Sequence, residues 1–177
     1  MNRLLLFLFV VYPLITSGQK LIKKPDVDKV TGDSTWKTSV DHIYNEGTFS
    51  SADMLESCIL KKKNAFGLLI YISRSGKNRI HFSIQKKLTF KFTNNATLVL
   101  EASLIGIDTN HTDSFPKRLD LCWALYKLTS VDISILKDNV IAEIEVETSA
   151  GNLDYKIKEK NSGIIAKQVA LITADQK

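Results

Sequence analysis

The chain has 177 residues, of which 44% are hydrophobic, and a formal net charge of +5. This length is sufficient for one domain with a substantial core and too short for two such domains. The mild basic excess is spread along the sequence and falls well short of the dense basic surface that nucleic-acid binding requires. We therefore expect no nucleic-acid partner.

The segment Met1–Gly18 has the composition of a secretory signal peptide. Arg3 precedes the apolar block Leu4–Tyr12, and the small residues Thr16–Gly18 follow it. Nine apolar residues are too few for a membrane-spanning helix, which needs about 20, so an uncleaved anchor is the weaker alternative. We predict cleavage near Gln19 and an exported protein, periplasmic or secreted, with no membrane span after cleavage.

The residues that follow this signal, Gln19–Ser34, are polar and charged, with Pro25 and Gly32 and no periodic pattern. This composition is typical of a flexible leader. We expect a single β-rich domain over residues 35–177, which begins near Trp36.

Alternation of apolar and polar residues dominates this domain and indicates half-buried β-strands. It is clear in Arg79–Gln85, Leu88–Thr93 and Leu119–Leu125, and Thr97–Ile107, which follows the turn residues Asn94 and Asn95, is a further strand candidate. By contrast, Ala65–Ile72 is continuously apolar, which predicts a strand that is buried on both of its faces.

A β-hairpin is predicted near the end of the chain. Val140–Val146 and Leu153–Ile157 both alternate, and the loop between them is Thr148–Gly151. An even number of loop residues keeps both apolar faces in one core, and Gly151 can adopt the positive φ that such a turn requires.

Two helices flank this hairpin. Thr129 followed by Asp132 forms a capping-box pattern that predicts a short helix over Ser130–Leu136. The segment Asn161–Asp175 has apolar residues at helical spacing, which predicts an amphipathic C-terminal helix docked on the sheet.

Together these elements predict a mainly β fold, an antiparallel β-sandwich-like domain of about seven to nine strands with a short helix and a C-terminal amphipathic helix. A lipocalin-like eight-stranded barrel is the alternative. It is favoured by the size and the export signal, and by Gly32 and Trp36 near the start, although their spacing departs from the lipocalin pattern.

The second half resembles small exported β-sandwich-like proteins of Bacteroidetes-type bacteria. The resemblance lies in the strand–turn–strand unit Leu88–Asn95 with Thr97–Leu100, in Leu128–Asp132, and in the hairpin around Gly151 followed by a closing helix. This chain differs at the turn, where Asn95 replaces the commoner glycine. The resemblance implies a fold and a cell-envelope or secreted location, and it implies no activity.

Four residues are candidates for covalent modification outside the cytoplasm. Cys58 and Cys122 form either a disulfide or two buried thiols, and the sequence leaves both open. Asn95 and Asn110 begin Asn-x-Thr sequons, which accept glycans only in a eukaryotic host.

No catalytic motif occurs in the chain: there is no nucleophile elbow, zinc helix, Walker loop or dinucleotide fingerprint. Glu143, Glu145 and Glu147 lie on one face of a predicted strand, and Lys156 and Lys158 of the next strand are their expected partners. The expected arrangement is a charged solvent face.

Metal ligands are equally sparse. The three histidines, His42, His81 and His111, lack the local spacing of a zinc site. Asp108–Asp113 alternates oxygen-bearing side chains as a calcium loop does, but it lacks the central glycine and the closing glutamate. We assign no catalytic, cofactor-binding or metal-ligating residue and expect no cofactor.

These observations favour an exported, non-enzymatic binding or accessory module with a protein or cell-envelope partner, whose oligomeric state stays open. The first alternative is a carrier of a small hydrophobic ligand, with a cavity lined by Phe66, Phe82, Phe90 and Trp123. The second is an exported hydrolase with unassigned catalytic residues.

Overall fold

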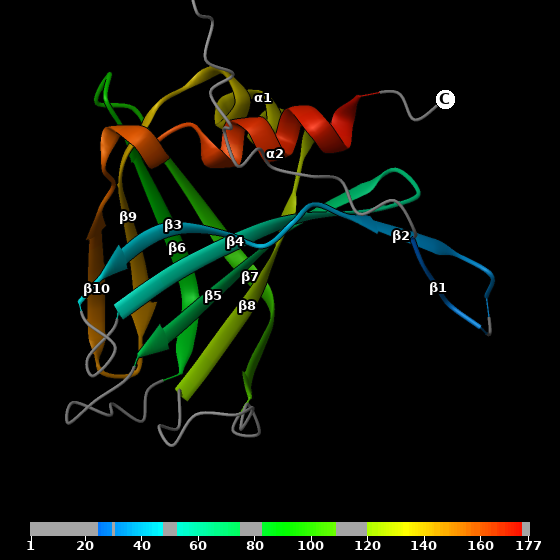
Figure 1. Cartoon of the computed structure of the whole chain (residues 1–177), viewed down its shortest axis with the longest axis horizontal. Coiled ribbons are helices and arrows are strands. Elements are labelled where there is room, and N and C mark those ends of the chain that lie inside the picture. The colour runs from blue at the N-terminus through cyan, green and yellow to red at the C-terminus, as the bar shows by residue number, and fades with distance from the viewer. Residues whose placement is uncertain (1–24, 30, 48–52, 75–82, 109–119, 175–177) are drawn as a thin grey trace, which may run out of the picture.

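The computed structural model describes residues 25–29, 31–47, 53–74, 83–108 and 120–174 (Figure 1). The predicted signal peptide lies outside these ranges and stays a prediction. The described chain is mainly β, as expected, with one antiparallel sheet and a helix at its end. The strands are β1 (Asp26–Val27), β2 (Ser34–Lys37), β3 (Asp41–Glu46), β4 (Asp53–Lys62), β5 (Ala65–Arg74), β6 (Ile84–Phe92), β7 (Thr97–Asp108), β8 (Asp120–Leu128), β9 (Ile141–Thr148) and β10 (Gly151–Lys156).

The order of the strands across the sheet is β1-β2-β4-β5-β8-β7-β6-β9-β10, and β3 pairs with β4 on the same edge as β2. The sheet does not close into a barrel, so the lipocalin-like alternative is wrong. Ten strands form where seven to nine were expected, because short strands near the start of the chain add to the edge.

The sheet bends at β7 and folds over itself. β7 pairs with β6 through residues 97–101 and with β8 through residues 102–108, and the register shifts between Ala102 and Leu104. The two halves then face each other, and Tyr155 of β10 meets Tyr44 of β3 edge to face at 5.0 Å between ring centroids. The architecture is therefore sandwich-like.

Part of the predicted leader belongs to this sheet. Asp26 and Val27 pair with Thr35 and Ser34, and Gly32 adopts a φ of +71° in the turn between β1 and β2. The leader prediction rested on polarity, which describes an exposed edge strand equally well.

The core lies between the two halves of the folded sheet. Leu68, Ile70 and Ile72 of β5 are fully buried on its inner face, opposite Leu88 and Phe90 of β6. The β9–β10 hairpin forms in the expected register, with Thr148 opposite Gly151, and Gly151 has a φ of +108°.

Two helices, α1 (Ser130–Asp138) and α2 (Ile164–Thr173), lie side by side at one end of the sheet (Figure 1). The capping box at the start of α1 forms as predicted: Thr129 Oγ1 accepts a hydrogen bond from the Asp132 amide, and the Asp132 carboxylate accepts one from the Thr129 amide. A single 3-10 turn, Glu159–Asn161, precedes α2, so the terminal helix is shorter than the predicted segment. Neither helix has the length and apolar character needed to cross a membrane, and no other helix occurs in the described ranges.

The side chain of Gln168 joins α2 to β3 and β4 through hydrogen bonds. It is fully buried, accepts a hydrogen bond from Ser57 Oγ at 2.8 Å, and donates to the Ser57 carbonyl at 2.9 Å and to Asp41 Oδ2 at 2.8 Å. Ser57 is fully buried, so the loss of this partner would be costly, whereas the half-buried Asp41 also accepts a hydrogen bond from Ser39 Oγ at 3.0 Å.

Replacement of Gln168 by leucine keeps the side-chain size and removes these hydrogen bonds. We expect Gln168→Leu to lower the free energy of unfolding by about 3 kcal/mol, because Ser57 and Asp41 lose their buried partner. Urea denaturation followed by circular dichroism measures the change. Lys167→Leu, at an exposed neighbouring position of α2, is the control. Equal stability of Gln168→Leu and the wild-type protein would contradict this role.

Candidate ligand-binding site

The outer face of the sheet, opposite the core, carries an apolar hollow of about 700 Å³. It lies over β4, β5, β8 and the second half of β7. Eleven residues line it, nine of them apolar or aromatic: Val40, Met54, Glu56, Leu60, Leu69, Tyr71, Ser73, Leu104, Leu121, Trp123 and Leu125.

The hollow exists because β5 is apolar on both faces and the described residues cover only one of them. Leu68 and Ile70 point to the core, whereas Leu69 and Tyr71 point outward and stay partly exposed. The expectation that Ala65–Ile72 is buried on both faces is therefore wrong for the outer face. The continuous apolar run is the sequence signal that marks this surface.

β8, like β5, is apolar on both of its faces. Cys122, Ala124 and Tyr126 are buried on the core side, so the alternating residues noted in the sequence, Leu121, Trp123 and Leu125, face outward. Period two alone does not tell which of two apolar faces is the inner one. Here Cys122, Ala124 and the large Tyr126 lie inside, and Leu121, Trp123 and Leu125 form part of the lining of the hollow.

A glycine fixes the position of the Trp123 indole. Gly106 of β7 lies directly opposite Trp123, and a Cβ on Gly106 would come within 2.3 Å of the ring atoms Cε2 and Cζ2. The indole therefore lies over the backbone of Gly106. Gly67 makes similar room for Leu125, whose Cδ1 would be 2.8 Å from an added Cβ.

Few polar groups reach the hollow. Glu56 is the only lining residue with a formal charge, and His42 Nδ1 lies 2.9 Å from its Oε1. Burial raises the pKa of Tyr71 to about 12, with smaller contributions from Cys58 and Glu56, so its hydroxyl stays protonated. Ser73 is only 4% exposed, and its Oγ has no hydrogen-bond partner among the described groups.

The predicted cavity residues do not come together. Trp123 lines the hollow, but Phe90 is fully buried in the core, and Phe66 packs against the core and under the Lys61 ammonium. Phe82 lies outside the described residues. Of the described residues in that set, only Trp123 lines the observed hollow, which is on the outside of the sheet.

The two cysteines do not form a disulfide. Cys58 is opposite Leu69 on the outer face, and Cys122 is opposite Ile72 on the core face. Side chains on opposite faces of a sheet point apart, which prevents the disulfide geometry. Burial raises the pKa of Cys58 to about 11.

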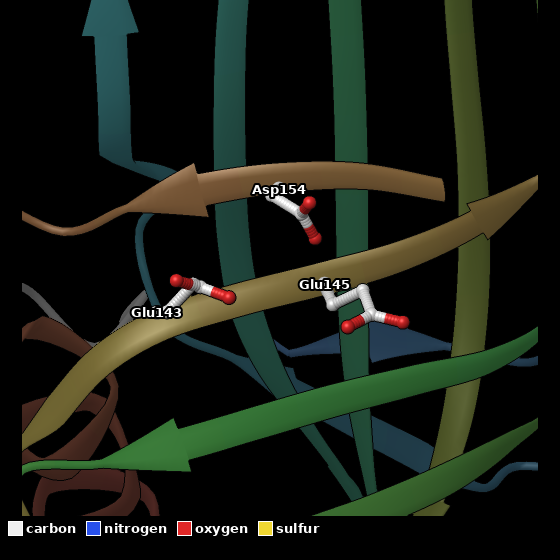
Figure 2. A group of neighbouring side chains, drawn as sticks. All are labelled: Glu143, Glu145 and Asp154. Carbon is white, nitrogen blue, oxygen red and sulfur yellow. The ribbon is translucent and has the colours of Figure 1, made fainter. Parts of the chain in front are cut away.

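The described residues contain one cluster with the geometry to hold a metal ion, the acidic face formed by Glu143, Glu145 and Asp154 (Figure 2). Single carboxylate oxygens of Glu143, Glu145 and Asp154 lie within 4.8 Å of one another, on β9 and β10. However, the Lys91 ammonium lies 2.6 Å from Glu143 Oε1 and 3.1 Å from Glu145 Oε2. Hydrogen bonds to both glutamates raise the pKa of Lys91, so this cation stays charged and offsets one of the three negative charges.

Lys91 of β6, rather than Lys156 or Lys158, is thus the cation that pairs with the glutamates. The sequence predicted a charged solvent face here, but it predicted that the pairing cations follow the glutamates in the next strand and not that they come from β6. Asp108 is in β7, and the rest of the proposed calcium loop lies outside the described residues, as do His81, His111 and Asn110. Asn95 occupies its turn with a φ of +64°, a conformation that asparagine tolerates better than most residues.

Comparison of the chain with protein-family models, with curated proteins and with solved structures returned no significant match. The functional argument therefore rests on the geometry described above.

The placement of the cysteines predicts two reactive thiols in the unfolded, non-reduced protein. In the folded protein Cys58 should react slowly with a disulfide reagent at neutral pH, because its raised pKa leaves little thiolate. Thiol titration before and after denaturation, together with the intact mass, measures both properties. A mass lower by two hydrogens, with no titratable thiol, would contradict the structure.

The packing of Trp123 on Gly106 predicts that Gly106→Ala displaces the indole toward solvent. In a Trp36→Phe background, which leaves Trp123 as the single tryptophan, we expect a red-shifted emission and stronger acrylamide quenching. Gly163→Ala, where an added Cβ meets nothing within 4 Å, is the matched control. An unchanged spectrum in Gly106→Ala would contradict the close packing.

Proposed function

We propose that this protein is an exported, non-enzymatic binding protein and that the outer-face hollow holds a small, mainly apolar ligand. The observation that carries the proposal is the apolar lining of the hollow on a sheet face that the described chain leaves uncovered. Export is the prediction made from the N-terminal segment, and the absence of catalytic motifs from the sequence supports a non-enzymatic role.

The size and chemistry of the hollow support a small ligand. Ligand pockets have volumes of about 300–1,000 Å³ and are mostly apolar with a few polar groups, and this hollow has that composition. Ser73 Oγ, buried and without a hydrogen-bond partner among the described residues, is a polar group that a ligand can satisfy.

Docking of a protein partner is the second candidate, and the exposure of β7 favours it. Leu104, Ile105 and Ile107 are 59%, 42% and 55% exposed. Among the described strands, this half of β7 pairs only with β8. A partner strand can add to such an edge by main-chain hydrogen bonds.

The neutral fluorescent probe N-phenyl-1-naphthylamine tests the proposed function. In the Trp36→Phe background we expect saturable binding with energy transfer from Trp123, because that indole lines the hollow. Introducing Val40→Asp and Leu104→Asp together should weaken binding about tenfold, since both exposed residues contribute apolar contact to the ligand.

The matched control carries Val99→Asp and Val131→Asp, two exposed apolar residues outside the hollow. An equal loss of affinity in both double variants would place the probe elsewhere and contradict the proposal. No binding to the folded protein would also contradict it and would leave the β7 edge as the binding surface.

A further inference from the structure

A row of side chains crosses five strands on the outer face. His42 on β3 is opposite Glu56 on β4, which is opposite Tyr71 on β5. Tyr71 is opposite Trp123 on β8, which in turn is opposite Gly106 on β7. Directly opposed residues in antiparallel strands have Cβ atoms about 4.5–5.5 Å apart, so the side chains of the row are neighbours on this face.

The centre of this row combines one carboxylate with two aromatic rings. Glu56, Tyr71 and Trp123 all line the hollow, and Glu56 is its only charged residue. The Trp123 ring lies against Gly106 through Nε1, Cε2 and Cζ2, and Trp123 also lines the hollow. Aromatic faces attract organic cations, above all when the cation is partly desolvated, and a nearby carboxylate supplies the counter-charge.

Two basic side chains lie close to Glu56 or to its neighbour Cys58 on the same strand. His42 lies beside the Glu56 carboxylate on the rim. Lys37, which acts electrostatically on the neighbouring Cys58, is itself paired with Asp26 at 3.2 Å. A cation that enters the hollow therefore meets an anion and two rings, whereas an anion meets the Glu56 carboxylate.

The adjacent row of the sheet is apolar. Leu69 is opposite Leu125, which is opposite Leu104, and all three line the hollow. This row runs parallel to the charged and aromatic one, one pleat away on the same face. It supplies a surface for a hydrocarbon chain directly beside the site for a cationic head.

We propose that the hollow binds an amphiphile with an ammonium head, which lies between Glu56, Tyr71 and Trp123, while its hydrocarbon tail lies along Leu69, Leu125 and Leu104. The proposal rests on the proposed function, because it names the ligand class of the same hollow.

Three probes with the same decyl chain test the head-group preference: decyltrimethylammonium, decanol and decanoate. Titration calorimetry on the mature protein, below the micelle concentrations and at one fixed pH, compares the three affinities. We expect decyltrimethylammonium to bind at least about tenfold more tightly than decanoate, with decanol between them.

Two variants separate the contributions of charge and ring. Glu56→Gln should remove most of the preference for decyltrimethylammonium over decanoate and leave decanol binding unchanged. Tyr71→Leu should weaken decyltrimethylammonium about fivefold and spare decanol. Glu101→Gln, at an exposed position of β7 outside the hollow, makes the same charge change and should have no effect.

The possible outcomes distinguish a failure of the ammonium site from a failure of the proposed function on which it rests. Equal affinity for the three probes, or a preference that Glu56→Gln leaves intact, would overturn the ammonium site while decanol binding upholds the hollow. A failure of all three probes to bind would overturn both proposals.

Discussion

The antiparallel sheet of this protein is bent, and the hydrophobic core packs against only one of its two faces, the inner one. The register shift between Ala102 and Leu104 lets β7 pair with β6 along one half and with β8 along the other, so the sheet folds over itself. The inner residues of β5 and β8 are then buried against β6, β9 and the two helices. The outer residues of the same strands form the hollow, and its shape depends on the bend.

Much of the fold follows from local sequence patterns. The alternation in β6 and β9, the capping box at Thr129 and the turn at Gly151 are short-range signals, and the structure forms each of them. Each of these patterns depends only on residues that are close in sequence, because local backbone geometry and local side-chain hydrogen bonds determine it. The barrel alternative was wrong because closure depends on whether the first and last strands meet, which no local pattern specifies.

The candidate site was harder to predict for a physical reason. β8 is apolar on both faces, so alternation does not tell whether Trp123 or Tyr126 points to the core, and the choice depends on which face the other half of the sheet covers. The row from Glu56 through Tyr71 to Trp123 joins residues up to sixty-seven positions apart in sequence. Only the pairing of three strands brings them together. The continuous apolar run of β5 was the local sign that this strand is apolar on both faces.

The central claim is that the ligand lies on the outer face of β5 and β8. Nuclear magnetic resonance of the labelled mature protein, titrated with decyltrimethylammonium, tests it directly. The account predicts that the largest amide and indole shifts occur at Leu69, Tyr71 and Trp123, with little change at Ile165 and Val169 of α2. Shifts concentrated at α2 or in the β9–β10 hairpin, or no shift at all, would contradict it.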